Sequence, residues 1–406
     1  WNLAMGARAE AEAKRQRTGK TVNTIVVCCG APKLSMGWFH LTQLLKDPKV
    51  ELRAVVEPFL LGAGKDTPGG KAFAELRASL AESHPDLEFL TSVSELPDAP
   101  PRSSEREPLL ALIAGRTCDA PALFADVVAK GATHVYVEKP GAENAEQLAG
   151  MRDLAERHDV AVVVGYNKNV AKYTRAGLAA LRECAGTGGA LPEVTLQHCN
   201  EFKPGPDLVA FMSGPGAEGM LHNMCCHELA LAVSLFGVTC DRVVEVALDE
   251  GASELVELEG GASDWARVRF RIEVAPPSAP SDVEAPLPRL WLEADRCGGN
   301  FSQLKLTPAE GEPRAFRLPD VEQAKLIEAA QATDPEIRPY FLQQAPDYAE
   351  LKRLFLEHVL AAEPGVPRGV VGLDAAYETL RLADLLVPVL KSCAASGKPW
   401  LRAATL

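Results

Sequence analysis

The sequence predicts an α/β protein, with a doubly wound parallel sheet followed by an α+β domain that has a large, open, mostly antiparallel sheet. Two patterns predict this fold class. Residues 22–165 alternate short apolar runs with helical segments, which is typical of parallel strands joined by helical crossovers. Residues 242–318 alternate apolar with polar side chains, which is typical of antiparallel strands with one exposed face.

Each element of the first half has its own signal. The strands are short, rich in β-branched residues and without polar alternation, as expected for strands buried on both faces. The helices are rich in Ala and Leu, and Gly131 closes one of them. The expected strands are 24–29, 50–56, 110–114, 135–137 and 160–165, and the expected helices are 39–45, 72–83, 122–130 and 145–158.

The pattern changes after Tyr166, and this change predicts the domain boundary. Residues 1–21 form an Ala-rich tail, 22–165 the first domain, and 166–406 the second, whose closing helices pack back. Proline-rich and serine-rich stretches at 97–106 and 275–288 predict surface loops. The second half is expected to contain strands at 193–202, 243–246, 266–272 and 290–293 and helices at 170–181, 223–235, 348–361 and 373–391.

Composition excludes several classes of function. The chain has 406 residues, 47% hydrophobic and 24% charged, as in globular proteins, and contains no apolar run long enough to cross a bilayer. Its net charge of −13 argues against nucleic acid as a partner, because phosphate binding needs a basic face. The basic stretch at 14–20 is expected to be a solvated helical tail. We expect no membrane insertion and a small-molecule substrate.

The ten cysteines lack the close spacing of a small disulfide-bonded domain, and most lie in apolar surroundings. A reducing compartment therefore fits best. The start at Trp1 leaves room for a removed organelle-targeting peptide, so cytosol and organelle stroma both stay open.

Glu138-Lys139-Pro140 is the most informative segment. It directly follows the apolar run 134–137, and ligands of an open α/β sheet bind at the carboxyl ends of its strands. A lysine there can hydrogen-bond a substrate hydroxyl and help carry its proton, since burial lowers an ammonium pKa readily. Taken alone, the segment fits a strand-ending turn with a solvated lysine better than a catalytic site.

The loop after the first strand fits an altered dinucleotide-binding loop and an ordinary strand–helix loop about equally well. The G-x-G-x-x-G pattern is absent: Cys28 replaces the first glycine, and about four extra residues precede Gly37. Lys33 and Ser35 are candidates to donate hydrogen bonds to phosphate instead. Glu57, at the end of the second strand, could accept both ribose hydroxyls and repel a 2′-phosphate, which favours NAD over NADP.

Taken together, these motifs resemble those of the Gfo/Idh/MocA oxidoreductases, the family of glucose–fructose oxidoreductase and inositol dehydrogenases. The resemblance covers nearly all of residues 22–406 and implies an N-terminal Rossmann domain. The segments that carry it are G-W-F-H at 37–40, V-E-K-P at 137–140, V-G-Y-N at 164–167, L-H-N-M-C-C-H at 221–227 and S-G-K-P at 396–399.

The resemblance also implies residue roles. Lys139 would contact the reacting hydroxyl and the nicotinamide ribose, and His227 would be the general base. Asn223, four residues earlier on the same helix face, would orient that imidazole or hold a second substrate hydroxyl, while Tyr166 and Asn167 would line the pocket. The cofactor, NAD with NADP as the alternative, would be held by Gly30, Lys33, Ser35, Gly37, Trp38, Glu57, Gly115, Arg116, Glu138 and Lys139.

Several positions depart from the family pattern. Gly115-Arg116 stands where the family carries a threonine–proline segment, and Arg116 brings a charge near the expected nicotinamide. Cys225 replaces a glycine and Ala230 an acid. Histidines and cysteines at 222–227 invite a zinc hypothesis, but adjacent cysteines chelate one metal poorly and no second C-x-x-C pair follows. We therefore expect no metal.

Two functional hypotheses follow. The first is a nicotinamide-dependent dehydrogenase or reductase for a polyol, sugar or related hydroxyl or carbonyl compound, with Lys139 and His227 in proton transfer. The second is a family member that has lost turnover and serves as a binding or scaffold subunit. Its grounds are the altered glycine loop and Arg116. The exposed face of the second-domain sheet predicts a homodimer or homotetramer.

Overall fold

The computed structural model describes residues 20–98, 107–186, 190–214, 217–276 and 288–403. Most of the predicted tail, its basic stretch, and large parts of the loops predicted at 97–106 and 275–288 lie outside these residues. The chain divides into two compact units: unit 1 comprises residues 1–167 and 324–373, and unit 2 comprises 168–323 and 374–406. This division differs from the sequence-based boundaries, because residues 324–373 belong with the first unit.

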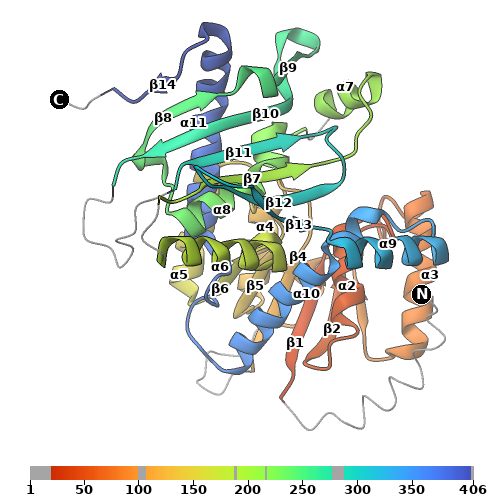
Figure 1. Cartoon of the computed structure of the whole chain (residues 1–406). Coiled ribbons are helices and arrows are strands. Elements are labelled where there is room, and N and C mark those ends of the chain that lie inside the picture. The colour runs from red at the N-terminus through yellow and green to blue at the C-terminus, as the bar shows by residue number, and fades with distance from the viewer. Residues whose placement is uncertain (1–19, 99–106, 187–189, 215–216, 277–287, 404–406) are drawn as a thin grey trace. The chain divides into compact units, whose positions relative to one another are not determined.

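Unit 1 contains a six-stranded parallel sheet in the order β3-β2-β1-β4-β5-β6, visible at the lower right of Figure 1. This is the doubly wound order, in which the connections reverse between β1 and β4 and leave a crevice at the carboxyl ends of the strands. The strands are β1 (Val22–Val27), β2 (Val50–Val56), β3 (Glu88–Leu90), β4 (Leu109–Ile113), β5 (His134–Val137) and β6 (Ala161–Val164).

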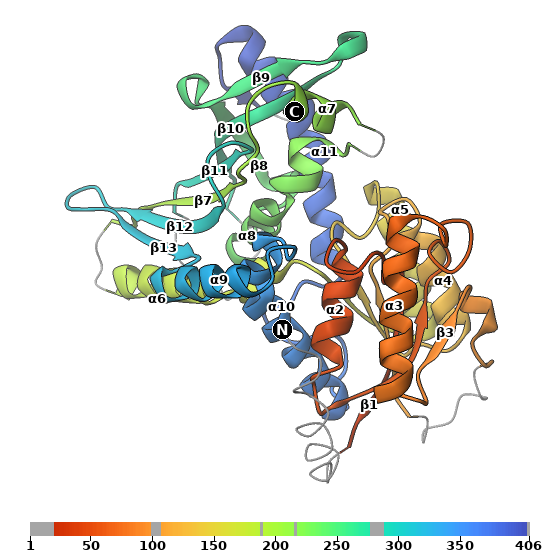
Figure 2. The ribbon, with the colours of Figure 1, turned by 90° about the vertical axis from the view of Figure 1, so that its right-hand side faces the viewer.

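Helices connect these strands, and two of these helices begin at a side-chain cap. Thr67 accepts a hydrogen bond from the Gly70 amide at one helix start, and Asn144 accepts one from the Gln147 amide at another. Figure 2 shows this unit from a second side. The helices are α2 (Met36–Leu44), α3 (Pro68–Ser83), α4 (Ala120–Ala129) and α5 (Ala145–His158), with the later α9 (Val321–Thr333) and α10 (Pro339–Leu360) returning from the second half.

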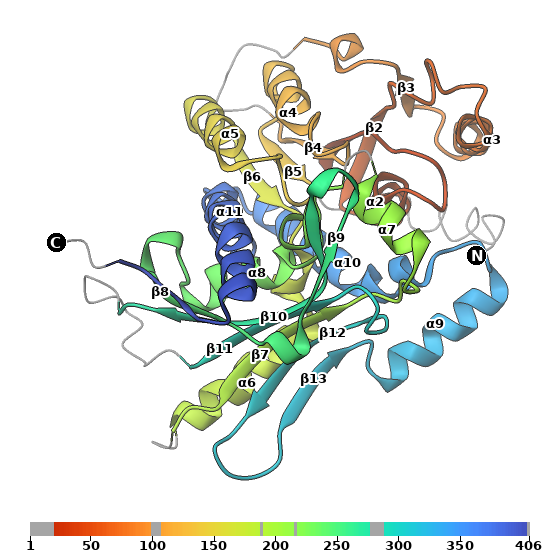
Figure 3. The ribbon, with the colours of Figure 1, turned by 90° about the horizontal axis from the view of Figure 1, so that it is seen from above.

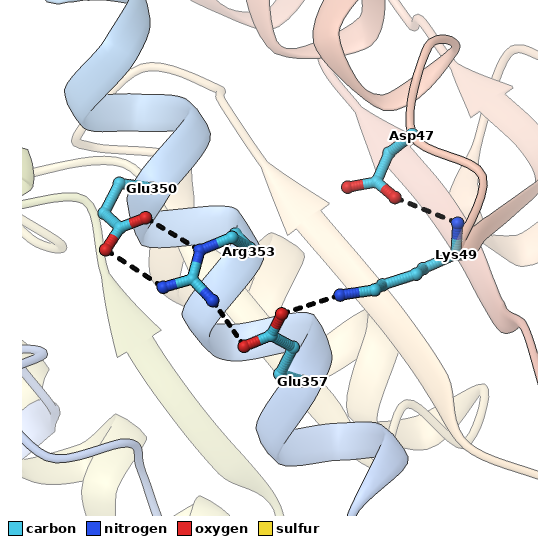
Figure 4. A network of polar contacts seen from close by, with 5 residues as sticks. All are labelled: Asp47, Lys49, Glu350, Arg353 and Glu357. Atoms are coloured by element: carbon cyan, nitrogen blue, oxygen red, sulfur yellow. Dashed lines mark hydrogen bonds and ion pairs between the residues drawn. The ribbon is translucent and has the colours of Figure 1, made fainter.

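Helix α10 packs on α2 and β1. Phe39 of α2 stacks on Phe341, with ring centroids 5.3 Å apart, and meets the edge of Tyr348. At the surface, Figure 4 shows Lys49 reaching Glu357 of α10, with 2.7 Å between Nζ and Oε1. Exposed ion pairs of this kind contribute about 0–1 kcal/mol each, so the aromatic cluster is the stronger tie.

Unit 2 is built on an eight-stranded sheet in the order β13-β12-β7-β11-β10-β8-β14, with β9 paired to β10. All pairs are antiparallel except β7 with β11. Side chains alternate between buried and partly exposed along β11 and β12, as the sequence predicts. The strands are β7 (Glu193–Cys199), β8 (Val243–Leu248), β9 (Glu254–Glu257), β10 (Ser263–Val274), β11 (Leu290–Asp295), β12 (Phe301–Thr307), β13 (Arg314–Leu318) and β14 (Trp400–Leu401).

The buried face of this sheet forms one core with the helices of the unit. Figure 3 shows α6 running along β12 and β13, against which it packs. A single π-helical turn, η4 (Met220–Met224), directly precedes the buried helix α8. The α-helices are α6 (Lys172–Gly186), α7 (Pro206–Ser213), α8 (Cys226–Phe236) and α11 (Leu373–Ser396).

The fold class is confirmed. The predicted helix at 223–235 is wrong at its start, because a π-turn ends there and α8 begins only at Cys226. The short edge strands β3 and β9 and the helices α7 and α9 lack a clear sequence pattern and were not predicted. No described helix has the length and apolar character needed to span a bilayer.

Candidate functional site

The first βα loop makes a sharp turn after β1. Cys28 has a positive φ of 62° and Gly30 one of 71°, a region in which glycine is favoured. A Cβ on Gly37 would lie 2.3 Å from the Cys28 carbonyl oxygen and 2.7 Å from that of Cys29, so α2 passes β1 at a distance that only glycine permits. This close helix–strand approach is the one that the third glycine of a dinucleotide fingerprint provides.

Glu57 follows β2 and is only 3% exposed. Its carboxylate accepts the Gly30 amide at 2.7 Å and the Leu60 amide at 3.2 Å. The side chain therefore joins the end of β2 to the glycine loop. Its oxygens retain lone pairs for further donors, because each carboxylate oxygen can accept more than one hydrogen bond.

The other polar groups of this loop have different partners. Ser35 is the N-cap of α2, but its side chain makes no capping hydrogen bond. Lys33, predicted to bind phosphate, pairs instead with Asp334 at 3.0 Å and Glu336 at 2.8 Å. These carboxylates raise the pKa of Lys33, so the ammonium is charged and already paired.

Three further predicted cofactor contacts, Arg116, Trp38 and Gly115, differ in their exposure and packing. Arg116 is 80% exposed and pairs with Asp119 three residues later, with 2.8 Å between Nε and Oδ2. Trp38 is half-buried and packs with the cluster of Phe39, Phe341 and Tyr348. Gly115 leaves little room: a Cβ there would lie 2.9 Å from a methyl group of Leu123.

Glu138 is part of a buried hydrogen-bond chain at the carboxyl end of β5. Its Oε1 accepts the Tyr136 hydroxyl at 2.8 Å and lies 2.7 Å from His40 Nε2. The other ring nitrogen of His40, Nδ1, lies 2.7 Å from Lys352 Nζ on α10. His40 is fully buried and Lys352 is 5% exposed, so this chain is shielded from water. The sequence singled out Glu138 and His40 but gave no signal for Lys352.

The charges along this chain follow from burial and from one another. Burial, followed by the nearby Lys352 charge, lowers the pKa of His40 to about 4. Burial likewise lowers the pKa of Lys352 to about 7, against the opposing pull of Glu138. For Glu138 burial acts upward, but hydrogen bonds from His40 and Tyr136 and the charge of Lys139 bring its net pKa below the ordinary value.

Lys139 follows Glu138 directly and is half-buried. The next strand, β6, leads to Tyr166 and Asn167, whose side chains are fully buried. Asn167 donates from Nδ2 to Gln344 Oε1 at 3.0 Å, so the G-Y-N segment is tied to α10. Within unit 1, the structure thus gathers the E-K-P segment, the glycine loop and Glu57 at one edge of the sheet.

In unit 2, the predicted base and its neighbour lie in different elements. His227 is in the first turn of α8 and 3% exposed, whereas Asn223 is in η4. The Cys225 amide donates to the Met220 carbonyl at 2.9 Å, five residues back, which breaks the regular α-helical register. The prediction that Asn223 and His227 share one α-helical face is therefore wrong. π-Turns recur at functional sites, and sequence periodicity does not reveal them.

Two polar groups lie around His227. The His198 ring meets that of His227 edge-on, with centroids 6.3 Å apart, and His198 Nδ1 lies 2.9 Å from Ser302 Oγ. The residue after His227, Glu228, forms a buried ion pair with Lys168 at 2.8 Å. Burial lowers the pKa of Lys168, although Glu228 opposes this shift. Breaking a buried pair of this kind is strongly destabilising, by about 3–5 kcal/mol.

A cavity of about 200 Å³ opens beside η4. Asn223, Glu218, Asp264 and Arg296 line it, and Arg296 pairs with Asp264 at 2.8 Å. Across the described residues, no three His, Cys, Asp or Glu side chains are grouped as a metal site. All ten cysteines are free, and burial raises the pKa of Cys28 to about 12, so this thiol is not ionised at neutral pH.

No protein-family model matches the sequence, and no curated protein matches it. Solved structures do match. A myo-inositol dehydrogenase from Lactobacillus casei in complex with NAD(H) and myo-inositol is 14% identical, with a TM-score of 0.62 over 95% of this chain and 98% of that chain.

Two other dehydrogenase-type structures are similar to the same extent. The myo-inositol dehydrogenase of Corynebacterium glutamicum is 17% identical, with a TM-score of 0.62 over 95% of this chain and 100% of that chain. GenD2 from gentamicin A biosynthesis, in complex with NAD, is 18% identical, with a TM-score of 0.60 over 96% of this chain and 98% of that chain. The predicted resemblance is thus confirmed at the level of the fold: the chain is folded like the inositol dehydrogenases of the Gfo/Idh/MocA type.

Proposed function

We propose that this protein is a nicotinamide-dependent oxidoreductase that transfers a hydride between NAD and a polyol, a sugar or a related hydroxyl or carbonyl compound. One observation carries the proposal. Lys139 lies two residues after β5 at the carboxyl edge of a doubly wound sheet, in a fold shared with a myo-inositol dehydrogenase in complex with NAD(H) and with GenD2 in complex with NAD.

The glycine loop fits a dinucleotide despite its altered sequence. Gly37 allows α2 to start against β1, and the amides at that helix N-terminus face the place where a pyrophosphate would lie. Ser35, whose hydroxyl makes no capping bond, is available as an additional donor. Glu57 would hold the ribose hydroxyls while keeping its bond to Gly30. When bound, the nicotinamide supplies the hydride acceptor or donor.

Two side chains, Lys139 of unit 1 and His227 of unit 2, would take part in the proton transfer. Lys139 Nζ would hydrogen-bond the reacting oxygen and stabilise its developing negative charge. A ring nitrogen of His227 would take the hydroxyl proton, and Asn223 and Tyr166 would orient the substrate. The support is the resemblance of E-K-P, G-Y-N and the 221–227 segment to the family motifs.

Partners and compartment complete the proposal. The partly exposed face of the β7–β13 sheet would mediate self-association into a dimer or tetramer, which light scattering after size exclusion would measure. The ten free cysteines support a reducing compartment, cytosol or organelle stroma.

The first experiment is titration of the protein with NADH and NADPH, followed by the fluorescence of the reduced nicotinamide. We expect NADH to bind more tightly than NADPH, because the Glu57 carboxylate repels a 2′-phosphate. Glu57→Gln should weaken NADH binding about tenfold and reduce the discrimination, since a charge-assisted hydrogen bond contributes about 1.5–3 kcal/mol. Glu88→Gln, an exposed acid of the neighbouring strand β3, is the matched control.

A preference for NADPH would contradict the role of Glu57. Where NADH binds, a screen of polyols and sugars for NAD reduction follows, and Lys139→Met should lower kcat at least a hundredfold. Activity that survives this substitution would overturn the catalytic role of Lys139.

The second candidate function, a binding or scaffold subunit without turnover, rests on the loop itself. Cys28 stands at a left-handed position, and Lys33 is engaged by two carboxylates. Absence of binding by both nucleotides, in protein shown to be free of bound cofactor, would favour this function over the oxidoreductase.

A further inference from the structure

The buried chain from Lys352 to Glu138 has one consistent arrangement of protons. Lys352 is an ammonium below its pKa of about 7, and an ammonium donates and cannot accept, so in that range His40 Nδ1 is the acceptor of the Lys352 hydrogen bond. Nε2 then carries the ring proton and donates it to Glu138 Oε1. His40 is neutral at pH 7, because burial and the Lys352 charge lower its pKa to about 4.

This arrangement balances charge inside unit 1. The cation of Lys352 and the anion of Glu138 compensate each other across a neutral ring that fixes both. A buried ion without such compensation carries a penalty of several kcal/mol, which explains why the ammonium and the carboxylate occur together. Tyr136 adds a second donor to the same oxygen, Oε1.

The G-Y-N segment makes room for the chain. A Cβ on Gly165 would lie 2.7 Å from the Tyr136 hydroxyl oxygen and 2.8 Å from Glu138 Oε1. Two sequence motifs, E-K-P and G-Y-N, thus meet at a single carboxylate oxygen, which is also the one that His40 holds. His40 of α2 and Lys352 of α10 therefore fix the orientation of Glu138. They also fix the backbone from which Lys139 extends.

We propose that Lys352 is a positioning residue: through neutral His40 it holds Glu138 as the fixed, charge-balanced neighbour of Lys139. The catalytic consequence rests on the proposed function, whereas the charge coupling does not. Without the ammonium, only Lys139 would offset the charge of Glu138, and His40 would bind a second ring proton more readily.

Other charged and titratable groups face the chain and enter its titration. Asp47 acts on Lys352 from the loop after α2, and Lys139 acts on Glu138 from the same segment. The phenol of Tyr340 acts on Tyr136, and the ring of Tyr348 lies 5.6 Å from Lys352 Nζ.

The test uses the full chain with ¹⁵N-labelled histidine and compares Lys352→Met with the parent. Methionine keeps the unbranched apolar stem. Resonances of His40 are assigned from their loss in His40→Gln. In the parent, His40 should be the Nε2–H tautomer and titrate near pH 4. In Lys352→Met, the proton affinity of His40 should rise at least tenfold, because the ammonium charge that opposes protonation of the ring is gone.

Lys49→Met is the matched control, because Lys49 is an exposed lysine that pairs with Glu357 of the same helix α10. It should leave the titration of His40 unchanged. If Lys352→Met does not fold, Glu138→Gln provides the reciprocal test: removing the carboxylate should weaken proton binding by His40 further, since Glu138 raises its pKa.

An unchanged titration of His40 in Lys352→Met would overturn the proposal. Where NAD-dependent turnover is found, the same variant should lower kcat about tenfold at pH 6 and progressively less above pH 7, where Lys352 of the parent is itself neutral, with NADH affinity within twofold of the parent. A merely structural role would lower activity at every pH alike. Protein without turnover defeats the proposed function, and the titration of His40 still decides the charge coupling.

Discussion

The absence of a Cβ atom on Gly37 determines how closely α2 can pass β1 at the first βα turn. The neighbours of Gly37 are the carbonyl oxygens of Cys28 and Cys29, which belong to the backbone and cannot rotate away as a flexible side chain would. The position tolerates no Cβ without moving either the strand or the helix.

We therefore expect Gly37→Ala to destabilise the protein by about 1–3 kcal/mol, as overpacking does, and to weaken NADH binding. Urea unfolding followed by circular dichroism measures the first effect and nucleotide titration the second. The control is Gly150→Ala in helix α5, where a new Cβ meets nothing within 4 Å. It should stabilise by up to about 1 kcal/mol. Equal effects of the two variants would contradict the close-approach interpretation.

The same loop shows where residue-level prediction from sequence stops. The glycine spacing and an acid after the second strand were readable, and the structure joins them through the Gly30–Glu57 hydrogen bond. The pairing of Lys33 was not readable, because Asp334 and Glu336 lie some 300 positions later in the chain. A charged side chain in a motif indicates which chemistry it could perform, but the motif does not indicate with which residue that side chain forms an ion pair.

At the scale of elements, the periodicity of apolar residues predicted most of the sheet strands, but it did not predict elements in which this periodicity is interrupted. The π-turn η4 inserts an extra residue before α8, so spacing rules for an ideal helix fail at Asn223. Helix α10 was expected to begin at 348 but begins at Pro339. The sequence did not indicate its first turns, because they bury Phe341 together with polar residues and show no continuous apolar stripe. Tertiary contacts, which sequence alone does not display, determine these boundaries.

Two histidines, the buried His40 and the half-buried His134, make the stability of α2 and β5 dependent on pH. Burial lowers the pKa of His40, and likewise that of His134, to about 4 from an ordinary value of 6.5. Between these values the unfolded chain binds protons that the folded chain does not, so the free energy of unfolding falls as pH drops from 6.5 to 4. The full penalty, at most about 3 kcal/mol per histidine, is present below pH 4.

His134→Phe should remove about half of this dependence and keep the ring contact with Phe355. Urea midpoints at several pH values from 7 to 4.5 measure it. Carboxylates such as Glu138, whose pKa is lowered, lose their contribution only at still lower pH and do not mimic the effect. A slope identical in the variant and the parent would show that His134 is not buried in its neutral form.

At the scale of the whole molecule, the chain crosses between its two units more often than the sequence suggests. The order of elements predicts one boundary near Tyr166, yet residues 324–373 form one compact unit with residues 1–167. The apolar face of α10 showed that the helix is packed, but its composition does not reveal which sheet it packs on. The structure shows that α10 packs in unit 1, through Phe39 of α2 and through the hydrogen-bond chain from Lys352 to Glu138.

This organisation predicts how destabilisation spreads. Cooperative units exchange their amide hydrogens together, so α10 should follow the parallel sheet and not the antiparallel one. In Gly37→Ala, hydrogen exchange measured by mass spectrometry should accelerate in β1, β4, β5 and in peptides from 339–360, while β7 and β12 keep their protection. Leu304→Ala, a cavity in the core of unit 2 at a fully buried position, should do the reverse. If α10 instead exchanges with β7 and β12 in both variants, then the helix belongs energetically to the second unit, and Lys352 could not act as a fixed part of the site at β5.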